Sequence, residues 1–253
     1  MREFSISNKS GEVYNLNNLR NFMHDPTGLG FVRSSSYTQI GDRYEILRDS
    51  FEQATPSGMI RFKNEPQTSA YDKYMKFTRF LQDIPLTLHY RSNKHHMIDV
   101  VADILQKTEY TKALGGLDVA LSFRALSKWY DEVEDAGTTK ASLYSDTRND
   151  GPCHIEITGV LTDPVWIQKV NGVQIMSGKV TASIASGETL HIRTDTNPYQ
   201  MYKTDGSGTV TDLYGSSDFS TERFVLLEYG ENSIECTGAA SVKVRGRLYY
   251  ETV

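Results

Sequence analysis

Four residues between positions 166 and 195 have side chains of the kind that bind sugars. Lectins built on β-sandwiches stack an aromatic ring on the apolar face of a pyranose and bind its hydroxyls with His, Arg, Asn and Asp. His191, Arg193 and Asp195 alternate along a predicted strand, so they share one face of it. Trp166 is expected one strand away. These residues form a candidate sugar site, and the polar segment after it adds Asn197 and Tyr199.

Two other interpretations of the same residues stay open. Trp166 lies between Val165 and Ile167, and a buried tryptophan is ordinary in a β-sandwich, so the favoured interpretation places it in the core. The charged strand can equally be part of a protein–protein interface. The sequence does not choose between a sugar and a protein as the partner of His191, Arg193 and Asp195.

Other clusters of polar residues do not predict catalysis. His95 and His96 are adjacent, and neighbouring strand residues point to opposite faces, so this pair is a poor metal site. Four carboxylates at 131, 132, 134 and 135 fall in a predicted linker, where they are expected to be solvated and not to act as a general acid/base pair. The chain has no Gly-x-Ser-x-Gly elbow, phosphate-binding glycine loop or His-Glu-x-x-His motif. We therefore expect no enzyme activity, cofactor or metal.

The composition excludes further classes of protein. A net charge of −5 argues against a nucleic-acid reader, which would carry a basic stripe. Neither a secretory signal at the N-terminus nor an apolar run of membrane-spanning length is visible, so an intracellularly made, soluble protein is expected. Cys153 and Cys236 are too few for a disulfide framework, and two free buried thiols are expected in preference to one bridge.

The first half of the chain predicts strands around one helix. Residues 3–16 predict a hairpin, residues 17–36 an irregular segment, and residues 44–51 a strand that pairs with 59–63. The segment 37–63 is charged and weakly apolar, which favours an extended arm or edge hairpin, with a solvated loop as the alternative. Further strands are predicted over 86–91, 97–105 and 117–124.

The helix is predicted over residues 69–81. Ala70, Tyr74, Phe77 and Leu81 form one amphipathic stripe at spacings of 4, 3 and 4. Ser69 can cap the first turn, and Asp72 three residues later completes an approximate capping box. This aromatic stripe indicates core packing, not a ligand site.

The second half predicts strands only. Asn171–Gly172 between two alternating runs is a strong hairpin signal, because a type I′ turn requires positive φ at both residues. A second turn at 186–188 precedes another alternating strand, and more strands follow at 199–203, 209–213, 224–227 and 242–250. Short strands at this spacing are typical of a β-sandwich. The acidic segment 129–139 gives the best domain boundary.

Several motifs, in this order, resemble the distal tail proteins (Dit) of siphophages that infect Gram-positive bacteria. In the first half the motifs are Gly28–Leu29–Gly30–Phe31, Gly58–Met59–Ile60–Arg61–Phe62, Ala70–Tyr71–Asp72–Lys73–Tyr74, Leu86–Thr87–Leu88–His89–Tyr90 and residues 117–130. In the second half they are Ile157–Thr158–Gly159, Pro164, Asn171–Gly172, residues 187–194, Asp205–Gly206, Glu228–Tyr229–Gly230–Glu231–Asn232 and residues 245–250. Each motif is weak alone, and their order over nearly the whole chain gives the resemblance its specificity.

The resemblance implies a mainly β structural protein of two domains. Residues 1–133 would form a β-rich ring (belt) domain with one helix and an extended arm, and residues 134–253 a galectin-like β-sandwich. Six copies would form a ring at the tail tip or baseplate of the virion, assembled in the host cytoplasm. The implied partners are the tail tube protein, the tail-tip fibre or lysin protein, and a receptor-binding or upper baseplate protein. Genomic DNA would pass through a central channel during ejection without specific binding, and no membrane is involved.

Within this resemblance the ring-forming arm carries the function. Trp166, His191, Arg193 and Asp195 are then better interpreted as structure and protein-contact surface than as a sugar pocket. A module that binds cell-wall saccharide during host adsorption is the alternative. The chain has no long insertion in its second half of the kind that some family members use to bind saccharide, which argues against that alternative.

Overall fold

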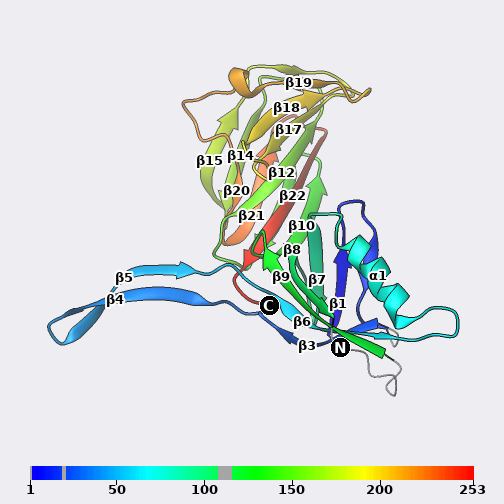
Figure 1. Ribbon diagram of the computed structural model, residues 1–253. Coiled ribbons are helices and arrows are strands. Elements are labelled where there is room, and N and C mark those ends of the chain that lie inside the picture. The colour runs from blue at the N-terminus through cyan, green and yellow to red at the C-terminus, as the bar shows by residue number, and fades with distance from the viewer. Residues whose placement is uncertain (1, 19–20, 108–115) are drawn as a thin grey trace. The chain divides into compact units, whose positions relative to one another are not determined.

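A computed structural model describes residues 2–18, 21–107 and 116–253. The chain divides into two compact units, one of Met1–Tyr130 with Tyr250–Val253 and the other of Asp131–Tyr249. Both are mainly β, as the sequence predicts, and Figure 1 shows the strands and the one α-helix of the described residues. The domain limits of 1–133 and 134–253 stay a prediction. Among the described residues, no helix has the length and apolar character needed to cross a membrane.

The described part of the first unit is built on antiparallel strands with one helix. Their pairings run in the order β3–β6–β9–β8–β7–β1–β2, and β4 pairs only with β5 among the described strands. The elements are β1 (Glu3–Ser7), β2 (Val13–Asn15), β3 (Asn21–Thr27), β4 (Arg33–Ile40), β5 (Arg43–Phe51), β6 (Ser57–Lys63), α1 (Ala70–Phe80), β7 (Leu86–Arg91), β8 (His95–Lys107), β9 (Gly116–Ala125) and the start of β10 (Trp129–Gly137).

Helix α1 begins at the predicted capping box. The Ser69 hydroxyl accepts from the Asp72 amide, and the Asp72 carboxylate accepts from the Ser69 amide, so two unpaired donors of the first turn are satisfied. Phe77 lies fully buried against Tyr14 and Phe62, with ring centroids 4.7 and 5.7 Å apart. The predicted aromatic stripe is therefore core packing.

The second unit contains two larger sheets whose inner faces bury its core. One has the order β19–β18–β17–β12–β22–β10 and the other β11–β21–β14–β15. The elements are β11 (Lys140–Ser145), β12 (Gly151–Thr158), β13 (Leu161–Thr162), β14 (Val165–Val170), β15 (Val173–Lys179), β16 (Ser183–Ile184), β17 (Thr189–Arg193), β18 (Gln200–Thr204), β19 (Val210–Asp212), a 3-10 turn (Tyr214–Ser216), β20 (Leu226–Leu227), β21 (Gly230–Cys236) and β22 (Ser241–Tyr250).

Local signals in the second half predict its strands well. Asn171 and Gly172 both have positive φ, 50° and 82°, and join β14 to β15 as the hairpin prediction requires. Along β12, Cys153, Ile155 and Ile157 are buried and the residues between them face outward. Cys153 and Cys236 are free and buried, as expected, and burial raises the pKa of the Cys153 thiol to about 12.

Two expectations about the first half are wrong. Residues 17–36 are not irregular, because β3 and the first half of β4 form there; residues 19–20 lie outside the described part. The strand over 44–51 does not pair with 59–63. It pairs with β4, while β6 lies between β3 and β9 with Ile60 and Phe62 fully buried. The arm is therefore the hairpin β4–β5, and β6 belongs to the core.

The acidic segment 129–139 is not a linker, because residues 129–137 of it form strand β10. Glu134 forms ion pairs with Lys243 at 2.8 Å and Arg245 at 2.7 Å, and Glu132 pairs with Arg247 at 3.3 Å. Acidic residues at period 2 on β10 face basic residues at period 2 on β22, which stabilises the pairing of two strands. These carboxylates therefore have ion-pair partners on the sheet surface.

Candidate functional site: an exposed hairpin and the outer surface of the second unit

The hairpin β4–β5 is an arm that contributes almost nothing to the core of its unit. All nine residues of β5 are exposed, and six of eight are exposed on β4. Figure 1 shows the two strands extending away from the other strands of the first unit. Exposed apolar side chains gather on it, namely Tyr37, Ile40, Tyr44, Ile46 and Leu47. An isolated two-stranded hairpin is marginally stable in water, and an apolar surface of this kind marks a site of contact.

The base of the arm is held by specific contacts. Phe31 packs edge-on against Phe51 with ring centroids 5.2 Å apart, and the Arg33 guanidinium lies over Phe51 at 5.1 Å. Arg33 also pairs with Asp49 at 3.3 Å. These contacts fix the base of the arm, whereas the apolar side chains farther along it, such as Ile40 and Tyr44, are exposed.

Trp166 is a core residue of the second unit. It lies on β14 with no exposed surface, and its indole N–H donates to the Arg223 carbonyl at 3.1 Å. Gly178 is its cross-strand partner, and a Cβ there would lie 2.4 Å from the indole ring. The glycine therefore makes room for the ring, and the favoured core interpretation agrees with this burial.

The predicted cluster of four residues does not form. Trp166 is on the sheet that contains β14, while His191 and Arg193 are on β17 of the other sheet. On β17, Leu190 and Ile192 are buried and the two polar residues face the opposite side. The expectation that Trp166 lies one strand from His191 is therefore wrong, because the sequence shows the period of each strand but not its sheet.

Arg193 and Asp195 form a bidentate ion pair on the outer face. Arg193 donates through Nε and Nη2 to the two carboxylate oxygens at 2.9 and 2.7 Å. Burial raises the pKa of Asp195, but the hydrogen bonds and charge of Arg193 outweigh it, so the pKa lies below its ordinary value. The hydrogen bond to Asp195 raises the pKa of Arg193. Both groups stay charged at neutral pH and offer a surface for polar partners.

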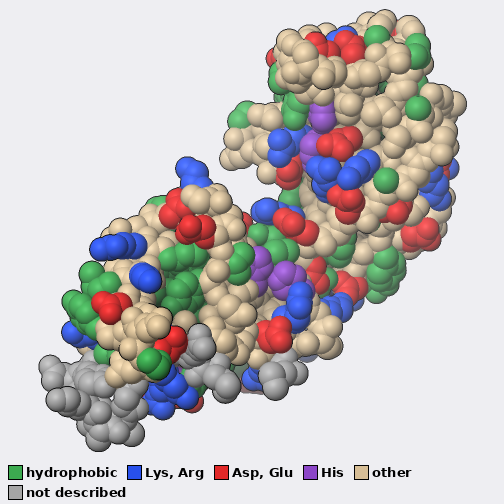
Figure 2. Space-filling view, turned by 90° about the vertical axis from the view of Figure 1, so that its right-hand side faces the viewer, with side chains coloured by type: hydrophobic (Ala, Val, Ile, Leu, Met, Phe, Trp, Pro, Cys, Tyr) green, Lys and Arg blue, Asp and Glu red, His purple; other side chains and the backbone are tan. Residues whose placement is uncertain are grey.

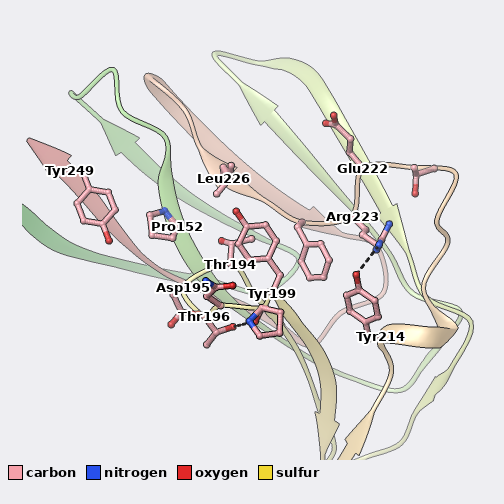
Figure 3. A pocket seen from close by; sticks show the side chains of 14 residues that line it. Pro152, Thr194, Asp195, Thr196, Tyr199, Tyr214, Glu222, Arg223, Leu226 and Tyr249 are labelled. Atoms are coloured by element: carbon pink, nitrogen blue, oxygen red, sulfur yellow. Dashed lines mark hydrogen bonds between the residues drawn. The ribbon is translucent and has the colours of Figure 1, made fainter. Parts of the chain in front are cut away.

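Asp195 also lines an open hollow of about 1030 Å³. In Figure 3, Asp195, Thr196 and Tyr199 lie on one side of it, and Tyr214 and Arg223 on the other. The ring of Tyr199 contacts Phe224 with centroids 5.3 Å apart. Aromatic rings beside fixed polar groups suit a saccharide or a peptide. The sequence pointed to Asn197 and Tyr199, but Tyr214 and Arg223 carried no signal because their proximity depends on the turn after β19.

Histidines occupy both units in pairs. His191 contacts His154 (Nδ1 to Nε2, 3.0 Å) and Thr204 (Nε2 to Oγ1, 2.9 Å). His89 contacts His95 (Nδ1 to Nε2, 3.1 Å) in the first unit. His95 is exposed and His96 is buried, as expected for neighbours on a strand, so they do not act together. The contact between His154 and His191 was missed because 37 positions separate them.

Comparisons with known proteins place these features in a family context. Residues 3–126 match the family described as "Distal tail protein, N-terminal domain". No curated protein sequence matches the chain.

The chain is also similar in fold to solved phage structures. One is a chain of the phage P2 baseplate in its activated conformation with Ca, at a TM-score of 0.71 and 15% identity over 100% of both chains. Another is the SPP1 Dit protein, described as a paradigm of the hub adsorption apparatus in phages that infect Gram-positive bacteria. It has a TM-score of 0.70 and 10% identity over 98% of this chain and 99% of that one.

Proposed function

Because the chain belongs to the distal tail protein family of phages, we propose that it forms a hexameric ring through its arm hairpins. Proteins of this family are structural hub components of the phage tail and baseplate, and not enzymes, so this chain is a part of the virion. In the proposed ring, the arm β4–β5 of one copy binds the next copy around the ring.

The exposed apolar surface of the arm carries this proposal. Ile46 and Leu47 are 58% and 69% exposed, and neither is needed to fill the core of the unit. Covering one such side chain contributes about 1.5–3 kcal/mol. Repeated on every copy, that contribution favours a closed ring over free monomers, because a head-to-tail contact that closes leaves no exposed arm.

The ring would join the tail tube to the tail-tip fibre or lysin protein and hold receptor-binding or upper baseplate proteins at its rim. A ring leaves a central channel through which genomic DNA could pass during ejection. The net charge of −5 supports passage without tight binding, because such a chain has no excess of cations to hold phosphates. The galectin-like character of the second unit is part of the same proposal.

Light scattering of the purified full-length chain tests the ring. We expect a particle of about six times the chain mass of 28.5 kDa. Ile46→Asp combined with Leu47→Asp is expected to give monomers, because the two changes lose about 3–6 kcal/mol of apolar burial and burying the two charges adds a further cost. The variant is confined to the hairpin, since a deletion of 37–63 would remove β6 from the core.

Val173→Asp is the matched control. Val173 is 66% exposed on the second unit, so the same apolar-to-charged change is made away from the arm, and the ring should persist. A wild-type chain that stays monomeric at micromolar concentration contradicts the ring. An arm variant that still forms the full particle contradicts the role of the arm.

A saccharide-binding role is the second candidate, supported by the hollow beside Asp195. Tyr199 is 43% exposed there and offers a ring to a pyranose. Calorimetry with host cell-wall saccharide should show binding that Tyr199→Ala weakens at least about tenfold, a loss of about 1.4 kcal/mol. No heat at millimolar saccharide would exclude this candidate and leave the ring untouched.

A further inference from the structure

The outer face of β12 and β17 brings three metal-binding side chains together. His154 and Glu156 are two residues apart on β12, so they share a face, and His191 on β17 is the direct cross-strand partner of Glu156. One ligand atom from each of the three lies within 4.8 Å of the others. Among residues 2–18, 21–107 and 116–253, no other group of three histidine, cysteine or acidic side chains meets this condition.

We propose that His154, Glu156 and His191 form a binding site for a divalent transition-metal ion of the Zn²⁺ type. Two imidazoles and one carboxylate are a common ligand set for such an ion. Figure 2 shows histidine side chains on the outer surface of the second unit, beside Lys, Arg, Asp and Glu.

The distances between the ligand atoms suit tetrahedral coordination. Zn²⁺ lies about 2.0–2.2 Å from nitrogen and oxygen ligands, so two ligands of a tetrahedral ion are about 3.3 Å apart. His154 Nε2 is 3.0 Å from His191 Nδ1 and 3.9 Å from Glu156 Oε1. These two spacings lie on either side of the ideal value, and the ligand atoms of Glu156 and His191 lie within 4.8 Å of each other.

The surroundings of His191 prepare it as a ligand. Thr204 Oγ1 lies 2.9 Å from Nε2, and a proton donated from Nε2 to this hydroxyl leaves Nδ1 with a free lone pair toward His154. Tyr202 stacks on the imidazole, with centroids 4.7 Å apart and 19° between the planes, which fixes the ring. Such partners hold the orientation of a ligand ring.

The protonation of the two histidines and the pairing of the nearby arginines are compatible with metal binding. Burial lowers the pKa of His154 and of His191, which favours the neutral imidazole, the form that binds metal. The cations Arg193 and Arg245 flank the site, but each has its own carboxylate, Asp195 and Glu134, at 2.7 Å. Arg245 also reaches Glu156 Oε1 at 3.5 Å, so a metal would replace it there. His154 also lines a hollow of about 370 Å³, so this ligand is reached from the surface.

A titration of the untagged full-length chain with Zn²⁺ tests the proposal. Calorimetry should show one ion bound per chain through this site, and Co²⁺ in place of Zn²⁺ should give the visible absorption of a tetrahedral complex. Ca²⁺ at millimolar concentration should not displace Zn²⁺, because Ca²⁺ takes six to eight oxygen ligands. A wild-type chain that binds no Zn²⁺ at millimolar concentration overturns the proposal.

Ligand variants separate this site from other histidines. His191→Ala and His154→Ala should each weaken Zn²⁺ binding by more than about 100-fold, since even a residue that only supports a ligand costs about 10–100-fold when lost. Glu156→Gln keeps the shape of the side chain and should weaken binding at least about tenfold, which guards against a loss caused by misfolding. Unchanged affinity in these variants overturns the proposal.

His89→Ala is the matched control. It removes an imidazole from the other contacting histidine pair, His89 and His95, and it should leave the affinity unchanged. If His89→Ala abolishes binding while His191→Ala does not, the ion binds in the first unit and the proposed site is wrong. Ring formation through the arm involves none of these three ligands, so the two proposals fail independently.

Discussion

Replacing Trp166 with alanine tests whether this residue stabilises the core or contacts a ligand. The indole has no exposed surface, and loss of a buried Trp or Phe side chain costs about 3–5 kcal/mol. That is a large part of the about 5–15 kcal/mol by which a domain is usually stable. With a urea dependence of about 2 kcal/mol per molar, the unfolding midpoint of the second unit should fall by about 2 M.

The smaller change Trp166→Phe separates packing from hydrogen bonding. A phenyl ring keeps most of the apolar contact but cannot donate to the Arg223 carbonyl, 3.1 Å from the indole nitrogen. An unpaired buried acceptor costs about 1–3 kcal/mol, so this variant should fall between wild type and Trp166→Ala. Tyr199→Ala, at an exposed residue of the same unit, should change stability by less than about 0.5 kcal/mol.

Urea unfolding of the full-length chain, followed by circular dichroism and by fluorescence, gives the measurement. In Trp166→Ala the remaining tryptophan is Trp129, buried in the first unit, so fluorescence reports that unit while circular dichroism reports both. The fluorescence transition should stay close to its wild-type midpoint. Unchanged stability by circular dichroism would refute the core assignment and make Trp166 a candidate ligand contact again.

Two further predictions concern the first unit. Ser69→Ala removes the cap of α1 and should lower the free energy of unfolding by about 1 kcal/mol, measured by urea unfolding; no change would mean that the capping box contributes nothing. The Arg61 guanidinium holds the pKa of Asp118 below its ordinary value, so this pair stabilises the fold at neutral pH and the contribution is lost as the pH falls below about 4. Arg61→Gln should therefore make acid unfolding begin at a higher pH, and an unchanged acid midpoint would contradict this.

Local sequence signals were sufficient where one strand or helix determines its own structure. The Asn171–Gly172 turn, the Ser69 cap and the alternation of Ile155 and Ile157 each depend on neighbours in the chain. The positive φ of a turn, the capping of a helix and the alternation of a half-buried strand are set by nearby residues, whatever the rest of the fold is. These elements were all located correctly.

Signals failed where burial or pairing depends on distant strands. The segment Arg33–Ile40 carries three serines in a row and has no apolar face, so nothing in it distinguishes an exposed strand from a loop. The acidic run in β10 resembles a linker until Lys243 and Arg245 of β22 are placed opposite Glu134. A run of charged residues fits a solvated linker and an ion-paired strand equally well, because both place charged side chains at the surface.

The candidate sites follow the same division. The sequence assigned His191 and Arg193 to one strand face correctly, but it could not say that Trp166 faces the core from another sheet. It also gave no reason to join His154 to His191, although the alternation His154–Ile155–Glu156 on a predicted strand is a signal for two ligands on one face. The third ligand, His191, comes close only through the pairing register of β12 with β17. That register depends on strands far apart in the chain, so a local pattern does not reveal it.

The two units use their surfaces in opposite ways, and this follows from where each buries its apolar residues. The strands of the second unit bury one face completely, so the outer face of β12 and β17 can carry His154, Glu156 and His191 without cost to the core. The arm has no buried face, and its exposed apolar side chains are stabilising only when another surface covers them. In the proposed ring, the arm would therefore be stabilised only when it binds a neighbouring copy. The outer face of the second unit can acquire or lose a ligand site while the unit stays folded.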